Sequence, residues 1–113
     1  MMTFFNNNQF EPFSSEITEQ FPLVLVEIYA DWSGSCHIMS PVIKDLKNDL
    51  NGSLKICRVN FDTDKTLINK YHITKTPAYL IFNQGKMIEK IEGIIPRKTL
   101  VNKIKILIRN GKN

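Results

Sequence analysis

Two nearly uninterrupted apolar runs constrain the fold of this chain more than any other feature. They are "LVLVEIYA" at residues 23–30 and "LKICRVNF" at residues 54–61. Runs this short and this apolar are typical of strands that are covered on both faces, as in the centre of a parallel sheet. Between them, from about residue 34 to about residue 50, apolar residues recur at steps of three and four, which predicts a helix. The pattern therefore predicts a parallel βαβ unit.

Shorter elements are predicted on both sides of this unit. We expect residues 1–9 to be a flexible lead-in and residues 11–20 to form a helix that ends before Pro22. A second short helix is predicted over residues 63–72, with Thr63 as its N-cap.

The C-terminal third reads as a hairpin followed by a helix. Residues 78–82 and 87–92 flank the turn "NQGK", in which Gly85 can adopt a positive φ. Pro96 suits the first turn of a last helix, and Gly111 suits its end. This helix has one apolar stripe, formed by Leu100, Ile104, Leu107 and Ile108. The whole order predicts an α/β fold with a mixed central β-sheet flanked by helices on both faces.

Length and composition favour one soluble domain over residues 1–113. The chain is 42% hydrophobic and 23% charged, and its apolar runs are far shorter than the roughly 18 residues of a membrane span. Residues 54–113 carry 13 basic and 4 acidic side chains, but no aromatic-rich or Gly/Arg-rich tract accompanies them. We therefore expect no membrane and no nucleic-acid partner, and we expect a monomer.

Cysteine and histidine usage limits the chemistry further. Cys36 and Cys57 are too few for a disulfide framework, and the first 20 residues lack Lys, Arg and a continuous apolar segment. Both features predict a cytoplasmic protein. One cysteine near His37 and a distant His72 do not have the spacing of a zinc site, so no metal or other cofactor is expected.

Several separate motifs, in their order, resemble thioredoxin from about Phe10 to Leu107. The stretch "VLVEIYADWSGSCHIMSPVIKDL" is followed by "VNFDTD", by "YHITKTPAYLIFNQGK" and by "IEG". The elements that carry the resemblance are Trp32, Pro41, Asp62, Thr76-Pro77, Gly85 and Gly93. The resemblance implies a thioredoxin fold and a thiol-redox protein that binds extended segments of client proteins.

The departure from the family lies in "WSGSC", where thioredoxins have Trp-Cys-Gly-Pro-Cys. Ser33 stands at the position of the attacking cysteine and Ser35 at that of the proline, and Cys36 matches the resolving cysteine. A serine hydroxyl does not exchange with disulfides, because the exchange requires a thiolate. Laboratory Cys→Ser substitutions that trap mixed disulfides normally remove the resolving cysteine, whereas here the attacking cysteine is the one replaced. We therefore interpret Ser33 as natural. Dithiol turnover is expected to be lost or weak, which leaves the status of the chain as an enzyme open.

Two interpretations of Cys36 remain open from the sequence. A thiol in the first turn of a helix is favoured as a thiolate by the positive helix end. The resemblance instead places Cys36 on the shielded side of the turn, where burial favours an inert thiol. His37 is either a cation that activates Cys36 or a solvated surface residue.

Glu27 is a polar residue within an apolar strand, and it matches the buried acid of thioredoxins. Burial would raise its pKa and make it a candidate proton acceptor for Cys36. The alternative is an ion pair with Arg58, and the two roles are compatible. Cys57 is interpreted as a buried core residue, and its alternative is a disulfide or relay with Cys36, which requires a close Cα distance.

The resemblance also implies a client-binding surface formed by Trp32, Gly34, Ser35, Thr76-Pro77 and Gly93-Ile94. It implies a cis Thr76-Pro77 bond, which leaves the Thr76 backbone available to pair with a client strand. Glu92 makes the rim of this surface more polar than usual, and Trp32 has the alternative of a packing residue. Two functions follow: a thiol-redox protein with Cys36 as its only candidate redox thiol, which forms mixed disulfides with clients, or a non-catalytic module that binds clients in this groove.

Overall fold

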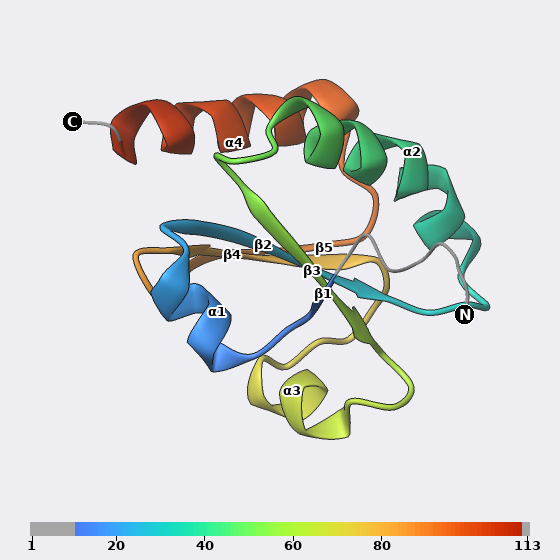
Figure 1. The fold of residues 1–113 in the computed structure, drawn as a ribbon. Helices are drawn as coiled ribbons and strands as arrows, with labels where there is room; N and C mark the ends of the chain where they lie inside the picture. The colour runs from blue at the N-terminus through green and yellow to red at the C-terminus, as the bar shows by residue number, and fades with distance from the viewer. Residues whose placement is uncertain (1–10, 112–113) are drawn as a thin grey trace, which may run out of the picture.

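The computed structural model describes residues 11–111, so the expected lead-in at residues 1–9 lies outside the described part. Figure 1 shows its strands and helices. In chain order they are β1 (Glu11–Pro12), α1 (Ser15–Gln20), β2 (Leu23–Tyr29), α2 (Gly34–Asp49), β3 (Lys55–Asn60), α3 (Lys65–Lys70), β4 (Ala78–Asn83), β5 (Lys86–Glu92) and α4 (Arg97–Gly111).

The strands form one mixed sheet in the order β1-β3-β2-β4-β5. β3 is parallel to β1 and β2, whereas β4 is antiparallel to both β2 and β5. Helices α2 and α4 lie on one face of this sheet and α1 and α3 on the other (Figure 1). The predicted parallel βαβ unit, the hairpin and the helices on both faces are therefore confirmed.

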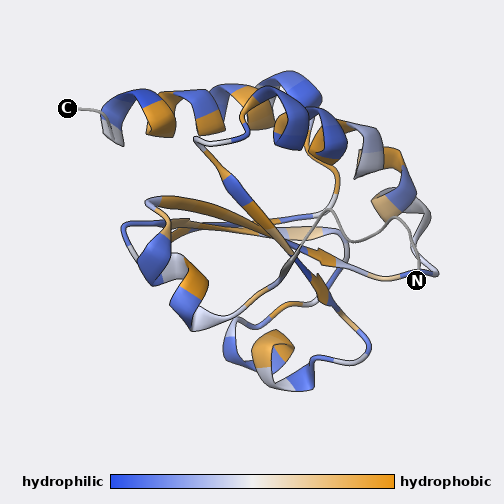
Figure 2. Ribbon diagram, in the orientation of Figure 1, coloured by the Kyte–Doolittle hydropathy of each residue, from blue (hydrophilic) through white to orange (hydrophobic). Residues whose placement is uncertain are grey.

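Side chains that alternate along the strands supply a core on each face of the sheet. On β2, Leu23 and Leu25 join the cluster beneath α2 and α4, while Val24 and Val26 join the cluster on the α1 and α3 side. This alternation follows from the two-residue repeat of a strand. Figure 2 shows the resulting pattern, with apolar strands between helices of mixed polarity. The sheet thus buries both of its faces, as the uninterrupted apolar runs require.

The predicted helix over residues 11–20 is too long at its start. Residues Glu11–Pro12 form a two-residue strand paired with Cys57 and Arg58, and α1 begins only at Ser15. Ser14, the N-cap, has extended backbone angles that separate the strand from the helix. Pro12 has no backbone donor, which an edge strand tolerates, and β1 lies at the edge of the sheet.

Two other boundaries differ from expectation by about one residue. Asp64, not Thr63, caps α3, because its side chain accepts a hydrogen bond from the Leu67 N–H at 3.2 Å. Pro96 immediately precedes α4 instead of lying within its first turn, and its carbonyl accepts from the Leu100 N–H at 3.1 Å. The hairpin turn is as predicted, with Gly85 at a φ of +83°.

Candidate functional site

The turn between β2 and α2 is organised by the Ser33 side chain. Ser33 is the N-cap of α2, and its Oγ accepts a hydrogen bond from the Cys36 N–H at 3.3 Å. Its backbone N–H donates to the Ala30 carbonyl at 3.1 Å, which closes the turn before the helix. Serine is a favoured N-cap residue because its short hydroxyl reaches the unpaired N–H groups of the first turn. The hydroxyl at this position therefore stabilises the start of α2.

Cys36 lies within the first turn of α2 and is only 7% exposed. Ser33 is similarly buried, at 6%, whereas Gly34 between them is exposed. Ser35 is half-buried. The shielded position implied by the resemblance is thus found in the structure, and little of the thiol region is open to a client.

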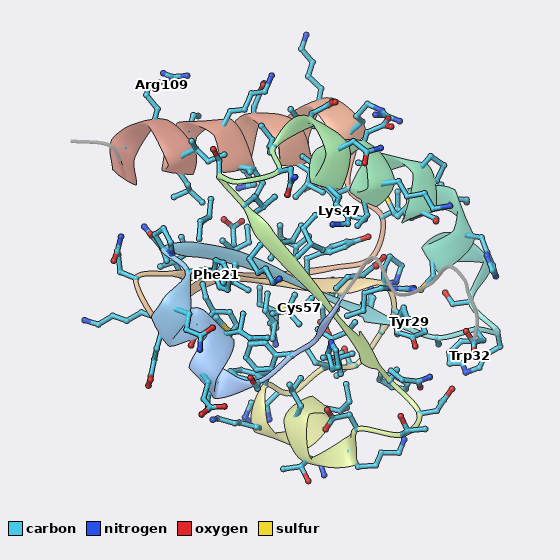
Figure 3. All side chains as sticks on the ribbon, viewed as in Figure 1. Phe21, Tyr29, Trp32, Lys47, Cys57 and Arg109 are labelled. Atoms are coloured by element: carbon cyan, nitrogen blue, oxygen red, sulfur yellow. The ribbon has the colours of Figure 1, made fainter. Side chains whose placement is uncertain are left out.

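Trp32 lies at the periphery of the molecule, in the loop that leads to α2 (Figure 3). Its side chain is 67% exposed, and its Nε1–H donates to Asp62 Oδ2 at 2.8 Å. The indole also meets the Phe61 ring edge-on, with the ring centroids 6.4 Å apart. The ring is therefore held at one edge while most of its surface stays open, which is unlike a half-buried packing residue.

Glu27 is buried in the centre of the sheet and paired with Arg58 on the neighbouring strand. Arg58 Nε donates to Glu27 Oε1 at 3.0 Å, and the Arg58 guanidinium also stacks on the Tyr29 ring at 3.8 Å. Burial raises the pKa of Glu27, and the Arg58 charge opposes part of that rise. The expected ion pair is confirmed, and the raised pKa is compatible with a proton acceptor.

The second half of the predicted client surface comes from the loops around β4 and β5. The Thr76-Pro77 peptide bond is cis, as expected, with Thr76 half-buried and Pro77 buried. The Gly93 N–H donates to the Pro77 carbonyl at 2.7 Å, and Gly93 has a φ of +90°. Ile94 follows with 52% exposure. One hydrogen bond thus joins the two loop segments that the resemblance implied.

Glu92 does more than make the rim polar. Its carboxylate accepts hydrogen bonds from the Thr74 N–H at 2.7 Å and from the Thr74 hydroxyl at 3.2 Å. The backbone hydrogen bond from Thr74 is the main cause that lowers the pKa of Glu92 below its ordinary value. Glu92 therefore fixes the segment that leads to the cis Thr76-Pro77 bond.

A pocket of about 430 Å³ lies beside the start of α2, and its lining includes Tyr29, Asp31, Cys36, His37, Ser40 and Arg58. His37 itself is exposed, and its Nε2 lies 3.2 Å from the Asp31 carbonyl oxygen. This geometry agrees with the surface-residue interpretation of His37.

Cys57 is fully buried on the α1 and α3 side of the sheet, among apolar neighbours. Cys36 and Cys57 are not joined by a disulfide. Within residues 11–111 there is no group of three His, Cys, Asp or Glu side chains that could hold a metal ion. No helix in this range has the length and apolar composition to span a membrane.

The family model for thioredoxin matches residues 4–106 of this sequence. Thioredoxin 1 of Synechococcus elongatus is 30% identical over 90 residues, which are 80% of this chain and 84% of that protein. Thioredoxin of Chlorobaculum thiosulfatiphilum is 33% identical over 92 residues, covering 81% and 85% of the two chains. The chain belongs to the thioredoxin family.

Solved structures agree on the thioredoxin fold. A mutant thioredoxin from Halobacterium salinarum superposes with a TM-score of 0.79 at 22% identity, over 88% of each chain. The oxidised mitochondrial thioredoxin 3 of Saccharomyces cerevisiae superposes with a TM-score of 0.78 at 19% identity, over 87% of this chain and 95% of that one.

Two partners of the site were not assigned from the sequence. Asp62 belongs to the thioredoxin resemblance, but its hydrogen bond to Trp32 joins residues that are 30 positions apart in the sequence. Thr74, the partner of Glu92, lies 18 residues before it, and no sequence motif marks the pair. An indole N–H near an exposed carboxylate is a signal for such a bond, but only the fold shows which carboxylate is near.

Proposed function

We propose that this chain is a thioredoxin-family protein whose dithiol cycle is lost or weak and whose redox thiol is Cys36. The observation that carries the proposal is the position of the Ser33 hydroxyl. This hydroxyl holds the N-cap of α2 beside Cys36, where the family motif has a second sulfur. Cys57 supports no substitute for that sulfur, since it is completely buried in the other core cluster.

In this scheme Cys36 reacts with one client disulfide and then needs an external thiol before it can react again. The Cys36 proton passes to Glu27, and the thiolate attacks one sulfur of a client disulfide. The Cys36–client S–S bond forms as the client S–S bond breaks, and the second client sulfur leaves as a thiolate. A low-molecular-weight thiolate then attacks the client sulfur of the mixed disulfide, so that Cys36 leaves as a thiolate and the small thiol stays in a disulfide with the client. We propose a monomer that meets its protein clients in a reducing, cytoplasmic compartment, which would supply that thiol.

A second candidate function is client binding without catalysis. The burial of Cys36 at 7%, next to Trp32 at 67% exposure and Ile94 at 52%, favours it. Exposed apolar groups beside a cis-proline loop can hold an extended segment whether or not the thiol reacts.

The experiment that tests the first proposal restores the missing sulfur. Ser33→Cys is expected to gain dithiothreitol-dependent reduction of insulin disulfides at least about 10-fold above the parent, equivalent to about 1.4 kcal/mol of barrier. The parent is expected to form a mixed disulfide with glutathione disulfide, detected by intact mass, and Cys36→Ala is expected to lose it. Cys57→Ala is the matched control and should retain it.

The outcomes separate the two candidates. If Ser33→Cys reduces insulin disulfides no faster than the parent, the missing sulfur at position 33 does not explain the loss of dithiol turnover. If the parent forms no mixed disulfide while client peptides still quench the single tryptophan, Trp32, equally in the parent and in Cys36→Ala, binding is the function.

A further inference from the structure

The Tyr79 side chain in β4 is completely buried, and its hydroxyl has no hydrogen-bond partner among the described residues. A buried donor without a partner is costly, and phenylalanine would fill the same volume without that cost. Packing alone therefore explains the ring of Tyr79 but not its hydroxyl.

Strand register places Tyr79 in a polar row. Tyr79 on β4 is the direct neighbour of Glu27 on β2, and Glu27 is the direct neighbour of Arg58 on β3. Arg58 already donates to one Glu27 oxygen at 3.0 Å. The row crosses three strands beneath α2, on the sheet face of the cluster to which Tyr79 belongs.

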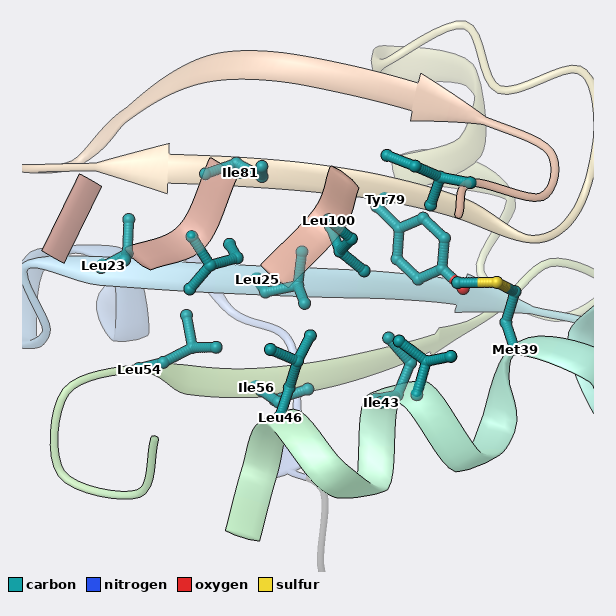
Figure 4. Packing of buried hydrophobic residues seen from close by; sticks show 13 residues of the cluster. Leu23, Leu25, Met39, Ile43, Leu46, Leu54, Ile56, Tyr79, Ile81 and Leu100 are labelled. Atoms are coloured by element: carbon teal, nitrogen blue, oxygen red, sulfur yellow. The ribbon is translucent and has the colours of Figure 1, made fainter. Parts of the chain in front are cut away.

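The hydroxyl end of Tyr79 reaches the first turns of α2. Figure 4 shows the ring extending from β4 toward this helix, with the hydroxyl next to the Met39 side chain, and both residues belong to the same core cluster. Met39 follows Cys36 by three residues, so the two side chains share a face of α2. The Tyr79 ring therefore points toward the part of α2 that buries Met39 and, one turn earlier, Cys36.

Electrostatics agree with this placement. Burial raises the pKa of Tyr79 far above its ordinary value, and negative charge on Glu27 or Cys36 raises it further, while Arg58 opposes the rise. The hydroxyl consequently keeps its proton across the physiological range and can act only as a neutral donor or acceptor. The charged or titratable groups around it are Glu27 from β2, Arg58 from β3 and Cys36 from α2.

We propose that the Tyr79 hydroxyl is the hydrogen-bond donor that stabilises the Cys36 thiolate. When the Cys36 S–H proton moves to Glu27, the sulfur gains a full charge in a site shielded from water, and Tyr79 donates to it while keeping its own proton. Arg58 already donates to Glu27 Oε1, and the proton taken from Cys36 neutralises Glu27, so the new negative charge lies on the sulfur. This role rests on the proposed function, in which Cys36 is the redox thiol.

The test is the ionisation of Cys36 followed by the ¹³Cβ chemical shift of labelled cysteine from about pH 5 to about pH 11 in the parent and in Tyr79→Phe. This signal needs no reagent to reach the sulfur. A hydrogen bond to a charged group predicts a midpoint higher by about 1 to 2 pH units in Tyr79→Phe, or a thiolate fraction about 10- to 100-fold lower at a fixed pH. Equal midpoints in the two proteins, or a Cys36 that remains a thiol in both up to unfolding, overturn the proposal.

Two controls keep the result specific. Tyr71→Phe removes a phenol on the other side of the sheet, where the Tyr71 ring meets Phe82, and should leave the Cys36 midpoint unchanged. The urea midpoint of Tyr79→Phe should equal or exceed that of the parent, because an unpaired hydroxyl is removed. A raised Cys36 midpoint without any mixed disulfide in the parent would refute the proposed function and keep the role of Tyr79. Mixed-disulfide formation in the parent together with equal Cys36 midpoints would refute the role of Tyr79 and leave the proposed function standing.

Discussion

Two consecutive rows of side chains cross the sheet beneath α2 and α4, and they differ completely in polarity. In the first row Leu25 lies between Ile56 and Ile81, and all three are buried and apolar. In the second row, two residues further along β2, Glu27 lies between Arg58 and Tyr79. The same three strands build both rows. Arg58 of the second row lines the same pocket as Cys36.

The difference separates the residues that stabilise the fold from those that serve the site. Burial of an apolar side chain stabilises the folded chain, whereas each buried polar group costs free energy unless it is paired. Arg58 compensates Glu27, but the Tyr79 hydroxyl remains without a partner in the described part of the chain. The polar row thus contributes less to the stability of the fold than the apolar row, and its Arg58 lines the same pocket as Cys36.

The largest effect is expected from breaking the apolar row. Leu25→Ala removes a fully buried side chain, so the free energy of unfolding should fall by about 2–5 kcal/mol, measured by urea denaturation. The Cys36 ionisation midpoint should stay at the parental value. A loss below about 1 kcal/mol would contradict the assignment of this row to stability.

An intermediate effect is expected from Glu27→Gln, which removes the carboxylate of the polar row. The pKa of Glu27 is raised above 4.5 in the folded chain, so the folded protein retains a proton that the unfolded chain has released. The contribution of Glu27 is therefore fully present below pH 4.5 and is lost as the pH rises through its folded pKa. Because glutamine does not titrate, the variant should lack this decline.

Urea denaturation from about pH 4 to about pH 9 tests this sign through the difference between variant and parent. The stability of Glu27→Gln relative to the parent should increase with pH. A difference that decreases with pH would mean that Arg58 outweighs burial and that the Glu27 pKa is lowered.

The smallest effect is expected from Glu92→Gln, which tests a polar contact outside both rows. The lowered pKa of Glu92 means that its stabilisation is present above pH 4.5 and is lost as the pH falls through its folded pKa. At pH 7 the variant should lose up to about 1 kcal/mol of unfolding free energy, because the Thr74 N–H then donates to a neutral oxygen.

Glu19→Gln, on the exposed surface of α1, is the matched control for Glu92→Gln and should match the parent within about 0.5 kcal/mol. The difference between Glu92→Gln and the parent should shrink toward zero in acid. A difference that is independent of pH would assign Glu92 a packing role instead of an electrostatic one.

Local patterns predicted most of the fold. The apolar runs gave β2 and β3, the three- and four-residue spacing gave α2, and Gly85 gave the hairpin turn. The errors lie at boundaries. The short pairing of Glu11–Pro12 with β3 is a long-range contact, and the choice between Thr63 and Asp64 as a cap depends on which side chain reaches an open N–H. Neither feature can be predicted from the spacing of apolar residues within one segment.

The sequence by itself determined that the stretch "WSGSC" holds Ser33 and a single cysteine, Cys36, and that an acid lies in an apolar strand. Only the tertiary structure decided which groups surround that acid. Glu27, Arg58 and Tyr79 come from three strands that are distant in sequence, and a shift of one residue in register would turn each side chain to the opposite face. Register is set by how both faces of the sheet pack against their helices, so it follows from the assembled core.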